Sequence, residues 1–419
     1  MRNRPFTRFI DRLRSGETAD WLVVAVALML PWSTTAIAIL IPFLALALLA
    51  SLDVASVRRE LMTPAGGLPV LLWVLAAIGM LWADVEWSER FHGLRGYHKL
   101  LGIPLLLAHF RRSDRVHWVI LAFVFSSVVL LTLSWLTPYR GFLGRPKAEF
   151  GVPFKDYLSQ SGIFAICAFG LLGQAAEWWR MQRGRLAAAA LILAAIFVAN
   201  IVFMATARST LLVMTVLLLL FGFLQFRWKG VLAVVLVAAA LASMSWVASP
   251  YLRERVTDLV EETQDYRADG APTSVGLRLE FWRKSVEFVA AAPLVGHGTG
   301  TIGALFRRDS AGGRGAGAVV TDNPHNQILA VAIQLGLVGA AVLIAMWIAH
   351  LALFNERTLI AWFGLTIVVG NIVSCLFHTH IVDTGQGWLY VFGVGMLGGA
   401  VLGRKAGAHV GWAKAPGTG

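Results

Sequence analysis

The chain has 419 residues, of which 57% are hydrophobic and 14% are charged, and its formal net charge is +12. Soluble domains carry roughly 25% charged residues, so this composition excludes a soluble enzyme, a disordered protein and a coiled coil. The sequence therefore predicts an all-α integral membrane protein. Its two cysteines, Cys167 and Cys375, each lie in an apolar run, and no disulfide framework is expected.

About twelve apolar runs approach the length of roughly 20 residues that a membrane-crossing helix needs. The first, Trp21 to Leu52, is broken at Pro31-Trp32-Ser33, and we interpret it as a hairpin of two spans. The run 99–110 is short, and it is a half-helix, a tilted helix or one that extends into its polar flank. The other runs lie at 69–84, 116–137, 157–176, 186–206, 209–226, 230–248, 327–353, 358–376 and 386–403.

This order of spans places both termini in the cytoplasm. Most of the excess of Lys and Arg then falls in segments on the cytoplasmic side, as the positive-inside rule requires. The net positive charge is thus a sign of topology, and nucleic-acid binding is not expected. The basic inner segments are expected to contact anionic lipid head groups. The basic N-terminus directly precedes the first span, and no cleaved signal is expected.

The spans divide the chain into three parts. An N-terminal bundle of about nine spans covers 1–248, a long outer loop covers 249–325, and a bundle of about three spans covers 326–419. In the long loop, helices are expected to begin at Ser249-Pro250 and at Ser274, because Ser favours the cap and Pro the first helical position. We expect these short helices, joined by glycine-rich turns, to form a cap on the outer face.

Arg208 lies at the hinge between two spans with almost no loop around it. An arginine at or near membrane depth is costly, and such residues are functional candidates. The alternative is a guanidinium that extends to the outer interface without a role. A merely tolerated arginine would usually lie on the inner side, which favours the functional interpretation.

Arg278 lies in the first turns of the helix expected from Ser274. Trp282 follows four residues later, where its indole is able to stack on the guanidinium. The alternative is a solvated helix face, with Arg283 and Lys284 as charged neighbours. The spacing alone does not separate these two interpretations.

His325 lies where the long outer loop re-enters the membrane as the span 327–353. Its unperturbed pKa, near ~6.5, allows an imidazole at this boundary to accept a proton from a hydroxyl at neutral pH. The alternative is a polar residue that only caps the helix, and for an isolated histidine this is the more common case.

No metal site or cofactor is predicted. His378 and His380 flank a short outer loop, but the sequence has no HExxH motif and no Cys–His cluster. It also has no acidic pair of the kind that metal-dependent sugar transferases use to bind a diphosphate. A diphosphate on the outer side would instead be neutralised by Arg and Lys. The turn Gly296 to Gly300 is also able to offer backbone N–H groups to an anion.

Three sequence features resemble the O-antigen ligase family of bacterial envelope glycosyltransferases. Arg278 to Gly298 resembles the R-x-x-x-W…P-x-x-G-x-G stretch of the family. His325-Asn326 followed after nine residues by Gly336 to Gly339 fits H-N-x9-G-x-x-G, which ligases share with polymerases and protein O-oligosaccharyltransferases. Ala207 to Thr210 resembles the hinge that carries the family's arginine. The motif detail covers about 205–340.

The resemblance implies a GT-C-like, inverting and metal-independent enzyme of the bacterial inner membrane. It would transfer O-antigen polysaccharide from undecaprenyl diphosphate to a sugar of lipid A–core on the periplasmic face, without a cofactor. By the same resemblance, His325 is the general base, and Arg208 and Arg278 hold the diphosphate. Secondary roles, in binding the diphosphate or core phosphates or in orienting His325 or a basic residue, fall to five further residues: Arg140, Arg145, Lys155, Lys99 and Asp383.

Three other functions stay open from the sequence. An O-antigen polymerase would use the same donor, but polymerases tend to have two long outer loops and this chain has one. A protein O-oligosaccharyltransferase usually has a longer C-terminal periplasmic region. A lipid or sugar transporter would place ionisable residues deep in several spans, whereas here they gather at the outer ends of the spans, and no internal repeat is evident.

Overall fold

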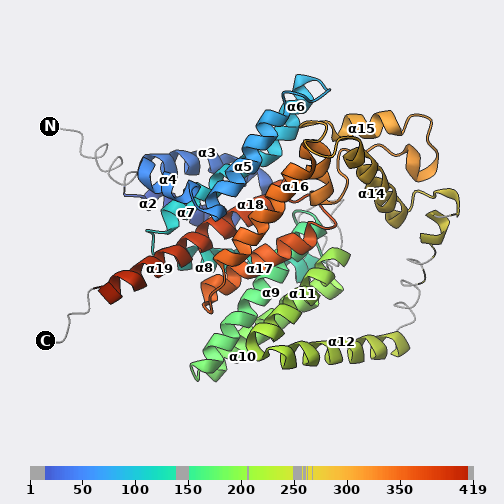
Figure 1. Cartoon of the computed structure of the whole chain (residues 1–419). Coiled ribbons are helices and arrows are strands. Elements are labelled where there is room, and N and C mark those ends of the chain that lie inside the picture. Colours follow the sequence, from blue (N-terminus) through green and yellow to red (C-terminus); the bar gives the residue numbers. More distant parts are fainter. Residues whose placement is uncertain are drawn as a thin grey trace.

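The computed structural model describes residues 15–137, 151–204, 207–248, 257, 261, 263–266 and 268–413. Within these ranges the chain is all-helical and contains no strand (Figure 1). This confirms the predicted fold class at the level of an all-α protein. Ser249-Pro250, the first helix start expected in the long outer loop, lies outside the described residues.

The helices follow one another with short connections. In chain order they are α2 (Glu17–Met29), α3 (Thr34–Ser51), α4 (Val54–Leu61), α5 (Pro64–Gly79), α6 (Trp87–Arg95), η1 (Gly96–Leu101), α7 (Gly102–Phe110), α8 (Val116–Leu136), α9 (Tyr157–Arg180), α10 (Gly184–Phe203), α11 (Arg208–Phe226), α12 (Trp228–Ala248), α14 (Ser274–Ala291), α15 (Ile302–Asp309), η4 (Gly315–Ala318), α16 (Gln327–Leu353), α17 (Leu359–Ser374), α18 (Thr384–Phe392), the π-helical turn η5 (Gly393–Leu397) and α19 (Gly398–Ala413).

The predicted apolar runs coincide with helices. The break at Pro31-Trp32-Ser33 separates α2 from α3, where the Ser33 side chain caps α3 by accepting from the backbone N–H of Ala36. The short run 99–110 forms η1 and α7, which continue α6, so this run extends into its polar flank. In the long outer loop, α14 begins at Ser274 as expected, with the Thr273 side chain as its cap.

Seven of the described helices are long and apolar enough to cross a membrane. The number is up to eight if α4 and α5, which are bent by 84°, form one broken span. Shorter helices such as α2, with 13 residues, fall below the length of a span. The count of about twelve spans, the cytoplasmic position of both termini and the division of the chain at 248 and 325 stay predictions.

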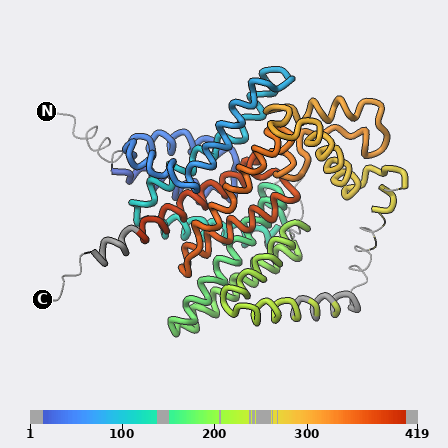
Figure 2. Tube along the Cα trace, in the orientation of Figure 1, coloured from blue at the N-terminus to red at the C-terminus, as the bar shows by residue number. Residues whose placement is uncertain are grey.

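The bundle is built from neighbouring antiparallel helices. In it α9 packs against α10 and α17, α5 packs against α16, and α11 forms a hairpin with α12, which Figure 2 follows in yellow-green. Where α11 meets α12, Gly222 and Gly230 allow the two backbones to approach closely. Large apolar side chains such as Phe43, Phe125 and Leu236 remain exposed on the outside of the bundle. Exposure of this kind is typical of a lipid-facing surface.

A break in α16 is filled by a distant loop. Gly336 has φ 63° and ψ −164°, a non-helical conformation that side chains rarely adopt. Four backbone hydrogen bonds join residues 293–298 to residues 333–338, and they replace the helical bonds lost at the break. Gly296 and Gly336, one from each predicted motif, thus lie against the backbone of the other segment, and the contact fixes residues 293–298 to α16.

The helices α14 and α15 form a small cap at the end of the bundle where α16 begins, at the upper right of Figure 1. Phe281 and Phe288 of α14 contact Phe306 of α15 edge to face, with ring centroids 5.6 and 5.2 Å apart. This cluster packs on Ala330 and Ile333 of α16. The cap therefore has an apolar core of its own, which continues onto the first turns of α16.

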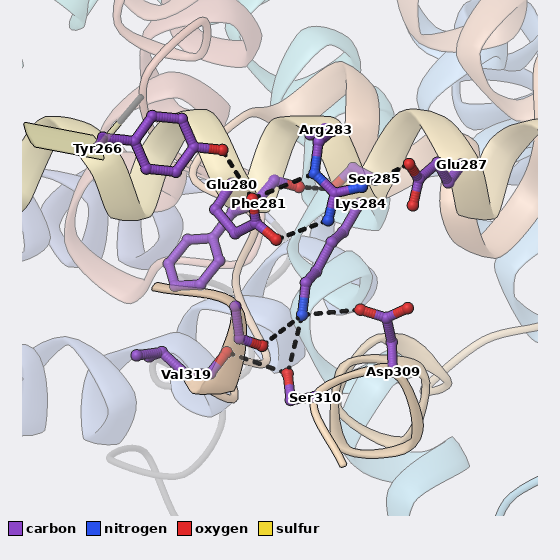
Figure 3. A network of polar contacts seen from close by, with 11 residues as sticks. Tyr266, Glu280, Phe281, Arg283, Lys284, Ser285, Glu287, Asp309, Ser310 and Val319 are labelled. Atoms are coloured by element: carbon purple, nitrogen blue, oxygen red, sulfur yellow. Dashed lines mark hydrogen bonds and ion pairs between the residues drawn. The ribbon is translucent and has the colours of Figure 1, made fainter. Parts of the chain in front are cut away.

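A buried lysine closes the cap. Lys284 has only 2% of its side chain exposed, and its ammonium lies 2.7 Å from an Asp309 carboxylate oxygen. It also donates to Ser310 Oγ at 3.1 Å and to the carbonyl of Gly317 at 2.7 Å (Figure 3). A buried ammonium needs such partners, and here they are supplied by the segment that follows α15. Lys284 therefore anchors residues 309–317 to α14.

Candidate functional site

His325 occupies a tight turn just before α16. Its backbone has φ 53°, the left-handed region, and its N–H donates to Asn323 Oδ1 at 2.8 Å. The cap of α16 is formed by Asn326, whose Oδ1 accepts from the N–H groups of Ile328 and Leu329. His325 is thus not the capping residue, and its imidazole projects from a strained position that the surrounding contacts maintain.

The imidazole of His325 is half-buried against the cap. It stacks on the ring of Phe281, with centroids 6.2 Å apart and an interplanar angle of 15°. Its Nδ1 is buried and has no hydrogen-bond partner among the described residues. Burial and the positive charge of Arg278 lower the pKa of His325 below its ordinary value. The ring is therefore neutral at pH 7 and is able to accept a proton.

Arg278 lies one turn before Phe281 on α14 and is half-buried. Burial is the main cause that lowers the pKa of His325 and of His378, and the positive charge of Arg278 lowers both pKa values further. The expected stacking of Arg278 on Trp282 is absent, and the cation–π pairs of the described residues lie elsewhere. Trp282 instead packs on Phe377, with ring centroids 6.1 Å apart. The guanidinium is therefore free of this aromatic contact.

Arg208 is the first residue of α11, and its side chain is exposed. Its neighbour Ser209 connects this helix start to the site, because Ser209 Oγ lies 3.1 Å from His378 Nε2. The His378 ring lies in turn 6.3 Å from the His325 ring, at an angle of 77°. The structure thus brings the hinge between α10 and α11, the start of α14 and the start of α16 to one place.

The spacing of His378 and His380 does not suit a metal site, and the sequence gave no sign of this contact. The structure stacks the two rings at 5.3 Å, and His380 Nε2 lies 2.6 Å from Ser374 Oγ. Burial is the main cause that lowers the pKa of His378 to about 3 and of His380 to about 4. Within the described residues, no group of three or more His, Cys, Asp and Glu is placed to hold a metal ion.

Three of the secondary residues gather around the start of α18. Asp383 caps α18 through its side chain and accepts from Lys99 Nζ through its carbonyl at 2.6 Å. Burial lowers the pKa of Lys155, and the charge of Asp383 partly opposes this effect. Asp383 therefore interacts with two lysines next to the loop that carries His378. Arg140 and Arg145 lie outside the described residues.

A large cavity with a mixed polar and apolar wall adjoins the His325 turn. Its volume is about 900 Å³, and Asn323, Pro324 and Thr379 form the wall next to the histidines. Other parts of the wall carry the cationic residues Arg95 and Lys99. The cavity is open to the surface, and it places these two basic groups beside the site together with the acidic residues Glu89 and Asp322.

The glycine turn 296–300 offers no free N–H group to an anion. All five of its backbone N–H groups donate within the protein, two of them to the carbonyls of Ile333 and Gln334 and one to Gln334 Oε1. The interpretation of this turn as an anion site is therefore wrong. The turn is short of donors because it pairs with the break in α16, a contact between segments far apart in the sequence.

Residues 193–344 match the family model Wzy_C, described as O-Antigen ligase. The matched segment is about a third of the chain, and it is similar to the O-antigen ligases over that length. No curated protein matches the chain. The match confirms the resemblance seen in the sequence, and it contains Arg208, Arg278 and His325. The match and the apolar helices together support a multi-pass membrane protein.

Proposed function

We propose that the protein is an O-antigen ligase of the bacterial inner membrane. It transfers O-antigen polysaccharide from undecaprenyl diphosphate to a sugar of lipid A–core on the periplasmic face. The observation that supports this is the convergence of the Arg208 helix start, Arg278 and a neutral His325 beside a cavity of about 900 Å³. The ionisable residues of this site lie at helix ends, which favours group transfer over transport.

The reaction follows from these groups. His325 takes the proton from an acceptor hydroxyl, whose oxygen attacks the anomeric carbon of the first donor sugar. The bond from that carbon to the diphosphate oxygen breaks, and undecaprenyl diphosphate leaves with the electron pair. Arg208 and Arg278 stabilise the charge that develops on the diphosphate, and attack from the opposite face inverts the anomeric centre.

We assign the acceptor to the cavity between α6, α15 and the His325 turn. The hydroxyl to be glycosylated would then approach His325 from the side of Asn323 and Pro324. Arg95 and Lys99 would bind anionic groups of the acceptor in this position. The donor diphosphate would lie on the other side of the imidazole, near Arg278 and the first turn of α11.

The test is a transfer assay with purified protein, polysaccharide-linked undecaprenyl diphosphate and rough lipopolysaccharide, in EDTA and without nucleotide. We expect a ladder on lipid A–core. His325→Ala should lower the rate roughly 10²- to 10⁴-fold, the usual contribution of a general base. The control His117→Ala, an exposed residue at the start of α8, should retain activity. Lengthening of the carrier-linked chain alone would instead show a polymerase.

A further inference from the structure

The loop between α17 and α18 and the turn that holds His325 form one hydrogen-bonded unit. Asn323 Oδ1 accepts both from the His325 N–H, at 2.8 Å, and from Thr379 Oγ1, at 3.0 Å. The backbone of Gln327 donates to the Cys375 carbonyl at 2.9 Å. A displacement of the loop that carries His378 would therefore move the turn that carries His325.

The same loop is connected to α11 by one side-chain contact. His378 Nε2 and Ser209 Oγ lie 3.1 Å apart, and Ser209 follows Arg208 in the first turn of α11. Thr210, on the same turn, hydrogen bonds Ser161 of α9 at 2.9 Å. The direction of this helix start is thus set by α9 on one side and by His378 on the other.

We propose that His378 is a positioning residue, which fixes the first turn of α11, and with it Arg208, relative to His325. This inference rests on the proposed function, in which Arg208 binds the diphosphate and His325 is the base. His378 would set the distance between these two residues. His378 itself takes no proton from the substrate. Its ring packs between those of His325 and His380, so small changes in its position are resisted from both sides.

The ring also suits this role chemically. Burial, the neighbouring His380 and the charge of Arg278 keep the pKa of His378 at about 3, and Asp383 opposes them only partly. His378 is thus uncharged at neutral pH, and its Nε2 forms an ordinary hydrogen bond with the Ser209 hydroxyl. Replacing the ring by Phe removes this bond while preserving both the charge and the packing.

The test uses full-length protein in the transfer assay, with His378→Phe, Ser209→Ala and the double variant. A single hydrogen bond is worth about one factor of ten, so each single variant should lower kcat/KM for the donor about tenfold. The KM for the acceptor should stay within about twofold of wild type. Because both substitutions remove the same bond, the double variant should be no worse than either single one. His378→Gln, which is able to bond Ser209, should recover part of the loss.

Four outcomes would overturn the proposal. The first is wild-type kinetics in His378→Phe. The second is a double variant whose loss of kcat/KM is the product of the two single losses. The third is a loss of activity that is explained entirely by a smaller amount of folded protein. The fourth is a change in the acid limb of the pH profile in His378→Phe, which would make His378 an acid–base group instead. Absence of transfer by the wild-type protein would overturn the proposed function, and only in that case would both proposals fail together.

Discussion

The backbone of His325 and its buried Nδ1 both carry an energetic cost. A left-handed conformation at a non-glycine residue costs of order 1–3 kcal/mol, and a buried nitrogen without a partner adds to it. Asn323 maintains this geometry by accepting from the His325 N–H and from Thr379. A residue held in this way is pre-organised for a hydrogen bond that a bound substrate is able to supply.

The electrostatic interaction between His325 and Arg278 predicts a pH dependence of the transfer rate. Because burial and Arg278 lower the pKa of His325, the neutral base persists to more acidic pH and is lost only as the pH falls through that lowered pKa. Arg278→Gln removes the charge, so the pKa of His325 should rise and the acid limb of kcat/KM should move to higher pH. Arg278→Lys keeps the charge and should leave the limb in place. The residual transfer of both variants, measured from about pH 5 to pH 8, checks this. Identical limbs would contradict it.

The sequence predicted three site residues because each has a local signature. Arg208 stands at a hinge between apolar runs, Arg278 in a helix start and His325 before a span. It did not predict the role of His378, because the contact with Ser209 joins residues 169 positions apart. The two histidines also lack the spacing of a metal site, so their pattern indicated no role.

At the scale of elements, the hydropathy pattern located the helices well, since the apolar runs depend on local composition. It did not predict the break in α16, because the break exists only where residues 293–298 replace the lost hydrogen bonds. The unbroken apolar sequence 327–353 is that of a single helix. Gly336 is the one residue in this stretch that could have indicated the break. Glycine is, however, also frequent in membrane-spanning helices that have no break.

This break predicts a specific loss of stability. A Cβ on Gly336 would lie 2.2 Å from the carbonyl oxygen of Leu294, and its φ of 63° would be strained for alanine. Gly336→Ala should therefore destabilise the protein by at least about 1–3 kcal/mol, the cost of holding alanine in this backbone conformation. The helix content should stay about the same. The control is Gly184→Ala at the start of α10, where no atom lies within 4 Å of the added Cβ. Thermal unfolding in detergent checks this, and equal Tm values for the two variants would refute it.

The lysine that closes the cap predicts a second effect. Lys284→Met keeps the buried stem but removes the ammonium that holds Asp309 and Ser310. Breaking a buried ion pair costs 3–5 kcal/mol, and we expect about 3 because Asp309 is 36% exposed and stays hydrated. Residues 309–317 should then be released, so that trypsin cleaves at the exposed Arg314 faster than in the wild type.

The control for the cap is Arg308→Met. Arg308 pairs with Asp84 at 2.9 Å, but the two side chains are 63% and 86% exposed. Exposed pairs contribute little to stability, so cleavage at Arg314 should be close to the wild-type rate. Equal cleavage in the Lys284 and Arg308 variants would show that the buried ammonium does not anchor the segment.

At the scale of the whole molecule, the site lies at the end of the bundle where α11 and α16 begin and α17 ends. The contacts of His378 with Ser209 and His325 bring these three ends together. The turns between α9 and α10 and between α16 and α17 then lie at the opposite end. Arginines occur at both turns: Arg180 and Arg183 at the first, and Arg357 at the second, where Glu356 precedes it. From the positive-inside rule we therefore expect the site on the outer side and these turns in the cytoplasm.

Cysteine labelling tests this orientation. With the buried Cys167 and Cys375 replaced by alanine, single cysteines are introduced at exposed positions: Ala311→Cys in the cap, and Met181→Cys and Asn355→Cys in the two opposite turns. A membrane-impermeant maleimide should label position 311 in intact cells, once the outer membrane admits it. Positions 181 and 355 should react only after the inner membrane is permeabilised, because they lie behind the hydrocarbon core. Labelling of 181 or 355 in intact cells, with 311 protected, would invert the topology. The proposed site would then face the cytoplasm, where a periplasmic donor and acceptor could not reach it.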